Sequence, residues 1–260
     1  MDQSYFKNAP NVSRILYKPE MKNIFYKIAE HFGISVTGIM GVNCESLIEF
    51  YNRNNAFTTV RTLTQFRYLN MENETGKEIL NSIINDPILY RENIESDLMK
   101  QIPSESERLQ LIDIERSKKR KNDSTTLNKI TQICNKKKTV TSAQISVQQR
   151  KLIIDLLTES NISEILKKEL PIVLVLDNAK IHKATDVEIA CEILNIELVF
   201  LPTYSPELNP IEDLWRIIKS VVYSTDYNSL DELVEIITTE FYENVTSESL
   251  YENWINEYMS

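Results

Sequence analysis

Hydrophobic positions from residue 171 onward predict a strand, a helix and a second strand. The run Pro171-Ile-Val-Leu-Val-Leu176 is uninterrupted, as is typical of a strand covered on both faces, and it ends at Asp177. Apolar positions then recur at helical spacing over 179–194, and Glu197-Leu-Val-Phe-Leu201 forms a second short run before Pro202. This succession predicts two parallel strands joined by a right-handed crossover.

The other periodic segments predict a hairpin and four further helices. Strand-forming residues fill Ile34–Val42 and Ser46–Tyr51, which meet at a short polar turn. Asn209 and Pro210 provide a cap residue and a first-turn proline for a helix over 211–222. Helical patterns also cover residues 58–69, 229–243 and 247–258.

The middle of the chain differs in character from both ends. Residues 70–168 are polar and rich in Asn, Lys and Glu, with a helical period but weak apolar spacing. We therefore expect three regions: residues 1–66 as the first part of a main domain, 67–168 as a helical, basic insert, and 169–260 as the second part of the main domain with C-terminal helices.

Charge is concentrated in that insert. The 260-residue chain has a net charge of −9, yet residues 115–151 hold 11 Lys and Arg against 2 acids. Such a basic island suits contact with a DNA backbone. It fits a solvated helix face or a flexible insert equally well. The expected DNA-binding residues are Lys118, Lys119, Arg120, Lys121, Lys136, Lys137 and Lys138.

Composition excludes several kinds of site. The 4 glycines form no phosphate-binding loop, and 2 histidines with 3 scattered cysteines cannot build a common zinc site. Any metal must therefore be held mostly by carboxylates. Unpatterned cysteines favour a reducing, cytoplasmic location, and no apolar run approaches the roughly 20 residues that span a bilayer.

Two carboxylates stand where chemistry is expected in a parallel sheet. Asp177 follows the most apolar strand, and Glu212 lies in the first turn of the helix after the second strand. Paired carboxylates suit Mg²⁺ or Mn²⁺ and thus phosphoryl transfer. Simpler roles remain open: Asp177 as a helix cap, Glu212 as the partner of Asn209 in a capping box, and His182 as a buried structural histidine.

The segment Leu176-Asp-Asn-Ala-Lys-Ile-His182, followed by Leu201-Pro-Thr-Tyr-Ser-Pro-Glu-Leu-Asn-Pro-Ile-Glu212, resembles the DDE catalytic domain of mariner-type insertion-sequence transposases. Between Asp177 and Glu212 lie 34 residues, the separation that this family uses between its second and third acids. The resemblance implies that Asp177 and Glu212 are the second and third catalytic acids, with Asn178 and His182 beside them. Asp2-Gln-Ser-Tyr-Phe6 resembles the strand of the first acid, with Gln3 in place of the usual Glu, and so implies Asp2.

The resemblance also implies a fold and an activity. The fold is α/β, a ribonuclease-H-like mixed sheet flanked by helices, here with the long basic insert. Asp2, Asp177 and Glu212 would hold two Mg²⁺ or Mn²⁺ ions, cut double-stranded DNA at transposon ends and join those ends to target DNA, with two protomers on paired ends. The family's N-terminal DNA-binding domains are not in this sequence, which leads us to expect a truncated copy. The alternatives are a catalytically silent DNA- or protein-binding remnant and a ribonuclease-H-like repair nuclease without strand transfer.

Overall fold

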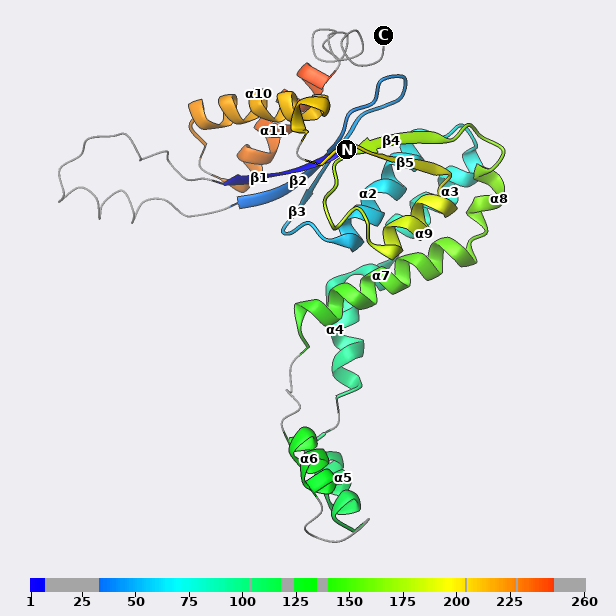
Figure 1. The fold of residues 1–260 in the computed structure, drawn as a ribbon, viewed down its shortest axis with the longest axis vertical. Helices are drawn as coiled ribbons and strands as arrows, with labels where there is room; N and C mark the ends of the chain where they lie inside the picture. The colour runs from blue at the N-terminus through cyan, green and yellow to red at the C-terminus, as the bar shows by residue number, and fades with distance from the viewer. Residues whose placement is uncertain are drawn as a thin grey trace, which may run out of the picture. The chain divides into compact units, whose positions relative to one another are not determined.

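The computed structural model describes residues 1–7, 33–102, 104–117, 124–134, 140–203, 205–227 and 229–245 (Figure 1). The chain divides into two compact units. The first combines Met1–Ile84 with Ile154–Ser260, and the second is Asn85–Ile153, which lies within the 67–168 range expected for the insert. The first unit carries all the strands of the described residues and is a mixed α/β structure, as the sequence predicts.

Three antiparallel strands form one sheet in the order β1-β2-β3. They are β1 (Asp2–Lys7), β2 (Gly33–Ile39) and β3 (Leu47–Tyr51). The pairing places Asp2 opposite Gly38 and Ile39 opposite Leu47. The predicted hairpin is therefore confirmed, and Asp2 does lie at the start of a strand.

The predicted parallel pair is also confirmed. β4 (Ile172–Leu176) and β5 (Ile196–Phe200) run parallel, and α9 (Thr185–Ile193) connects them. α9 begins later than the expected 179, because residues after Asp177 form turns. β4 is less covered than an apolar run predicts, since 56% of Val173 is exposed.

Helices account for the rest of the first unit. α2 (Ala56–Leu69) begins at a capping box: the Asn55 side chain accepts from the backbone of Phe57 and Thr58, and the Thr58 hydroxyl accepts from the Asn55 amide. The remaining helices of this unit are α3 (Glu74–Ile84), α8 (Ile162–Leu166), η4 (Pro206–Leu208), α10 (Pro210–Ser224) and α11 (Leu230–Val245).

The main core lies between the three-stranded sheet and two of these helices, as Figure 1 shows for α10 and α11. Phe6 and Val36 of the sheet pack with Trp215 of α10 and Phe241 of α11, and all four are buried. The Trp215 ring stands edge-on to Phe6, with ring centroids 6.1 Å apart. This core fixes the start of α10, and with it Glu212, over the sheet that carries Asp2.

The second unit is helical in its described residues, as expected for the insert. It contains η3 (Pro87–Leu89), α4 (Arg91–Lys100), α5 (Glu105–Ser117), α6 (Ser124–Cys134) and most of α7 (Ser142–Glu159). α5 packs against α6. Within the described ranges, no helix has the length and apolar character that a bilayer crossing requires. The helix expected over 247–258 lies outside the described residues.

Candidate active site

Asp2 is buried at the start of β1, with 6% of its surface exposed. Its Oδ2 accepts a hydrogen bond from Nε1 of Trp215 at 3.0 Å. Gly38, opposite Asp2, lets the indole come close, because a Cβ at that position would lie 2.7 Å from Cζ2 of Trp215. The strand pair and α10 thus fix the position of the Asp2 carboxylate from two sides.

Asp177 directly follows β4, and 45% of its side chain is exposed. Its Oδ1 accepts from the backbone N–H of Ala179 at 3.2 Å. Asn178 turns the other way, and its side-chain amide donates to the carbonyl of Leu201 just beyond β5. These bonds hold the chain after β4 in turns, which is why the helix does not begin at 179.

His182 lies behind Asp177 and is 1% exposed. Its Nδ1 is 2.8 Å from Oδ1 of Asp177, although the ring is poorly aligned for a hydrogen bond, and its Nε2 has no partner among the described residues. Burial lowers the pKa of His182 and outweighs the attraction of Asp177. The imidazole is therefore neutral near pH 7 and contacts Asp177 without balancing its charge.

Glu212 is exposed in the first turn of α10, where the helix dipole favours a carboxylate. Asn209 stands at the cap position and Pro210 at the first turn, as predicted, but the Asn209 side chain makes no capping hydrogen bond. The neighbouring Asp213 pairs with Arg216 at 2.9 Å. Glu212 and Asp213 therefore differ in their surroundings, because the Arg216 cation lies beside Asp213.

The other two expected acids affect Asp2 electrostatically. The pKa of Asp2 is raised to about 7, first by burial, then by the negative charge of Glu212 and, more weakly, that of Asp177. Mutual repulsion between carboxylates is what a divalent cation relieves, and three carboxylates suit Mg²⁺ or Mn²⁺. Within the described residues, however, no group of three or more His, Cys, Asp or Glu side chains is close enough to hold a metal ion.

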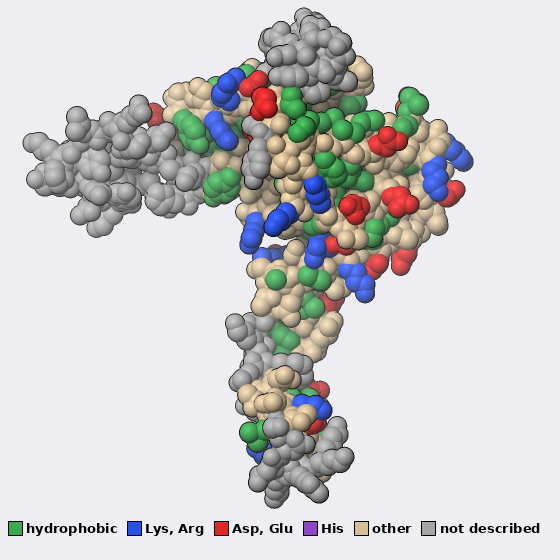
Figure 2. Space-filling model, in the orientation of Figure 1, with side chains coloured by type: hydrophobic (Ala, Val, Ile, Leu, Met, Phe, Trp, Pro, Cys, Tyr) green, Lys and Arg blue, Asp and Glu red, His purple; other side chains and the backbone are tan. Residues whose placement is uncertain are grey.

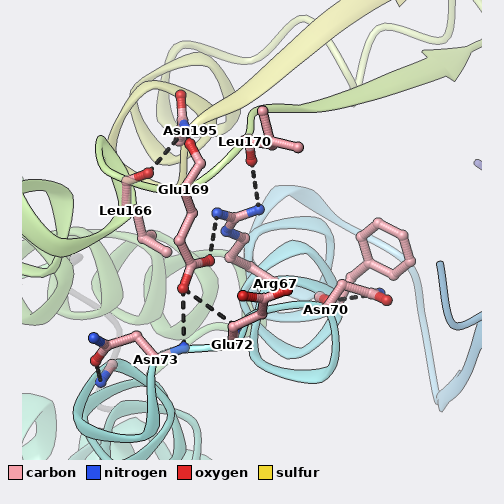
Figure 3. A network of polar contacts seen from close by, with 10 residues as sticks. Arg67, Asn70, Glu72, Asn73, Leu166, Glu169, Leu170 and Asn195 are labelled. Atoms are coloured by element: carbon pink, nitrogen blue, oxygen red, sulfur yellow. Dashed lines mark hydrogen bonds and ion pairs between the residues drawn. The ribbon is translucent and has the colours of Figure 1, made fainter. Parts of the chain in front are cut away.

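A buried ion pair that the sequence analysis missed fixes the start of β4 (Figure 3). Arg67 of α2 is 1% exposed, and its Nη2 lies 3.0 Å from Oε2 of Glu169. The other carboxylate oxygen of Glu169 accepts from the backbone N–H groups of Glu72 and Asn73. Burial lowers the pKa of Arg67, and Glu169 partly offsets this effect. The sequence did offer one signal of this ion pair, because Arg67 is a charged residue within the apolar helical pattern of 58–69.

Asn195 extends this network on the far side of β4. Its backbone adopts the left-handed conformation (φ 54°) between α9 and β5. Its side-chain amide donates to the carbonyls of Leu166 and Glu169, at 3.0 and 3.2 Å (Figure 3). Glu169 therefore connects α2, the start of α3 and the turn before β5. These contacts fix the direction in which β4 runs towards Asp177.

The expected DNA-binding residues of the insert, Lys118, Lys119, Arg120, Lys121, Lys136, Lys137 and Lys138, lie outside the described residues. They follow α5 and α6 in the sequence. Their part in DNA binding stays a prediction.

Comparison with protein families gives a match for about the second half of the insert and the segments that follow it. Residues 108–234 match the model of the DDE superfamily endonucleases, a stretch that contains Asp177 and Glu212 and leaves out Asp2. Searches of curated proteins and of solved structures found no match. Together with the mixed α/β fold, the family match supports a DDE transposase-type catalytic domain in this chain, an enzyme of the nuclease or transposase type with DNA as its substrate.

Proposed function

We propose that this chain cleaves DNA and transfers the cut strand with two divalent ions, Mg²⁺ or Mn²⁺. Asp2, Asp177 and Glu212 would be the ligands, and they would have to move closer together than in the described structure to hold the ions. The observation that carries the proposal is the match of residues 108–234, which hold Asp177 and Glu212, to an endonuclease family. Burial, and then the charges of Glu212 and Asp177, raise the pKa of Asp2, which agrees with a shared site. Asp2 thus lies within electrostatic reach of acids 175 and 210 positions further along the chain. Bound cations would neutralise that charge and let a DNA phosphate approach.

The three acids would have different tasks. When bound, a pair of such ions supplies activation of the attacking oxygen and stabilisation of the leaving 3′ oxygen in an in-line displacement at phosphorus. Asp177 is 45% exposed and Glu212 is also exposed, so both acids are accessible to a substrate. Trp215 holds the buried Asp2 carboxylate, and Glu212 lies in the first turn of the same helix, α10. His182 is a positioning residue that limits where the Asp177 carboxylate can turn.

Nicking of supercoiled plasmid by the full chain tests this proposal. We expect nicking with Mg²⁺ or Mn²⁺, and a loss of about 100-fold or more in Asp177→Asn and Glu212→Gln, because each removes a negative ligand. Asp213→Asn is the matched control: it changes an acid one position from Glu212 in the same helical turn and should keep full activity. Nicking that survives Asp177→Asn would contradict the proposal.

Strand transfer needs a second measurement. Joining of a labelled donor end to target DNA would distinguish a transposase from a ribonuclease-H-like repair nuclease, which cuts without joining. Two protomers on paired ends would also give joined products that contain two donor ends.

The unpaired thiols of Cys44 and Cys191 support the cytoplasmic location that we expected.

A silent remnant is the second candidate, and one contact favours it. Trp215 occupies one oxygen of Asp2 with a hydrogen bond, so that oxygen must be released or shared before it can bind a cation. A remnant would show no metal-dependent nicking, and Asp177→Asn would change at most its stability. The plasmid experiment therefore decides between the two candidates.

A further inference from the structure

The ammonium of Lys183 lies at the carboxyl end of the parallel strand pair. Its Nζ is 5.0 Å from the centroid of the Phe200 ring, within the range of a cation–π contact. Phe200 is the last residue of β5 and pairs with Leu176, the last residue of β4, which Asp177 follows. Lys183 therefore holds a positive charge at the same edge of the strand pair as the candidate acid Asp177.

The backbone of Lys183 is fixed as well. The preceding residue, His182, is 1% exposed, and its N–H donates to the carbonyl of Ala179 at 3.0 Å. The N–H of Lys183 donates to the carbonyl of Lys180 at 3.3 Å. The main chain and the ammonium are thus both held in place, which lowers the loss of side-chain freedom when an anion binds.

The charge of Lys183 is held but not neutralised. Lys183 is exposed, and among the ion pairs of the described residues its ammonium has no carboxylate partner. The aromatic ring beneath it carries no charge, and Asp177 contacts His182 instead. An ammonium in such a position can donate hydrogen bonds to an anion that comes from solution.

The surroundings favour a polyanion over a small anion. Figure 2 shows Lys and Arg side chains gathered over the turns that follow β4 and over the start of α2. The chain as a whole has a net charge of −9, so a single small anion gains little by approaching it. A nucleic-acid backbone gains more, because each phosphate that a cation neutralises releases condensed counterions.

We propose that Lys183 binds a backbone phosphate of the DNA substrate at the carboxyl end of β4 and β5, and so holds the strand beside Asp177. This inference rests on the proposed function, because it takes DNA as the ligand of the same site. The ammonium donates to a non-bridging phosphate oxygen, and the Phe200 ring keeps the ammonium in place. The contact involves only the backbone and is therefore the same for all DNA sequences.

DNA binding in EDTA tests this contact without any cutting. The affinity of the full chain for a short duplex is measured at several salt concentrations. We expect Lys183→Gln to weaken binding several-fold and to reduce the slope of log affinity against log salt concentration by about 0.9, the contribution of one phosphate. Lys183→Arg should keep both values, since a guanidinium also stacks on a ring and binds phosphate. Lys168→Gln is the matched control, because Lys168 is an exposed lysine before the opposite end of β4.

A further variant separates phosphate binding from a purely structural role, in which Lys183 would only fasten the turns to β5. Lys183→Met keeps an apolar stem over Phe200 and removes the charge. We expect it to lose the same 0.9 of the salt slope as Lys183→Gln, with an unchanged melting temperature. It also replaces Lys183→Gln if that variant does not fold.

Three outcomes would overturn the inference. The first is an equal salt slope in the wild type and in Lys183→Gln, and the second is a loss in Lys183→Arg as large as that in Lys183→Gln. The third is a wild type that binds no duplex, which would overturn the proposed function at the same time. A wild type that binds DNA with the expected slopes but does not nick it would support this contact and contradict the nuclease proposal alone.

Discussion

The indole of Trp215 donates a hydrogen bond to the carboxylate of Asp2, across 213 positions of sequence. The same ring packs against Phe6 and Phe241 in the main core. Trp215 therefore couples the packing of the core to the geometry of the candidate active site.

Gly38→Ala should disturb this coupling. A Cβ at Gly38 would lie 2.7 Å from the Trp215 ring, which is fully enclosed and cannot move away cheaply. We expect a loss of about 1–3 kcal/mol in the free energy of unfolding and a shift in tryptophan fluorescence. Gly33→Ala is the matched control in the same strand: its nearest neighbour is the hydroxyl of the exposed Tyr5, which can swing aside. Equal losses in the two variants would show that the clash with Trp215 is not the cause.

Asp2 should make the stability of the metal-free protein depend on pH. Its pKa is about 7 in the folded chain against an ordinary value of 3.8, so the folded state holds a proton that the unfolded state releases. Asp2 therefore makes its full contribution to the free energy of unfolding below about pH 4. That contribution is lost as the pH rises towards 7. The urea midpoint of the wild type should fall across that window, and that of Asp2→Asn should fall less.

Mg²⁺ provides the complementary measurement. At pH 8, above the pKa of about 7 of Asp2, that carboxyl carries a charge, and a bound cation would relieve its repulsion with Glu212 and Asp177. Millimolar Mg²⁺ should therefore raise the melting temperature of the wild type, but not that of Asp2→Asn or Asp177→Asn. A rise of the same size in all three proteins would place the cation elsewhere.

Arg67 should be needed for stability to a degree that exposed ion pairs are not. Arg67→Met leaves Glu169 without its cation, and we expect a loss of about 3–5 kcal/mol in the free energy of unfolding. Adding Glu169→Gln should restore part of it, because the uncompensated charge is gone. The exposed pair of Arg216 and Asp213 is the control, and Arg216→Met should cost about 1 kcal/mol or less.

The basic residues of the insert should control how DNA binding responds to salt. Each phosphate contact contributes about 0.9 to the slope of log affinity against log salt concentration. Changing Lys118, Lys119, Arg120 and Lys121 to Gln should therefore flatten that slope and weaken binding similarly on unrelated sequences. Lys77→Gln with Lys100→Gln is the control, because both lysines already pair with carboxylates. An unchanged slope would exclude these four residues from DNA contact.

Local patterns in the sequence predicted most of the elements around the site. The apolar runs ending at Leu176 and near Phe200 are the parallel strands, and Asn209-Pro210 begins the helix that carries Glu212. The start of α9 was placed too early, because Ile181 continues a helical period that the side-chain bonds of Asp177 and Asn178 interrupt. Such competition between side chains and backbone is invisible to a periodicity argument.

Long-range contacts were beyond the reach of the sequence. Arg67 and Glu169 are 102 positions apart, and nothing in either local pattern links them. The position of Asp2 came from resemblance to a family motif, since a short strand next to the chain start has no period of its own. Its contact with Trp215 needed the structure.

The distance in sequence between Asp2 and Trp215 has a consequence for protein synthesis. Asp2 precedes the insert in the chain, and α10, which bears Glu212 and Trp215, follows only after the whole insert has been made. A nascent chain consequently has no complete set of acids until α10 has emerged and docked. The order of synthesis therefore places the assembly of the candidate site after that of the insert.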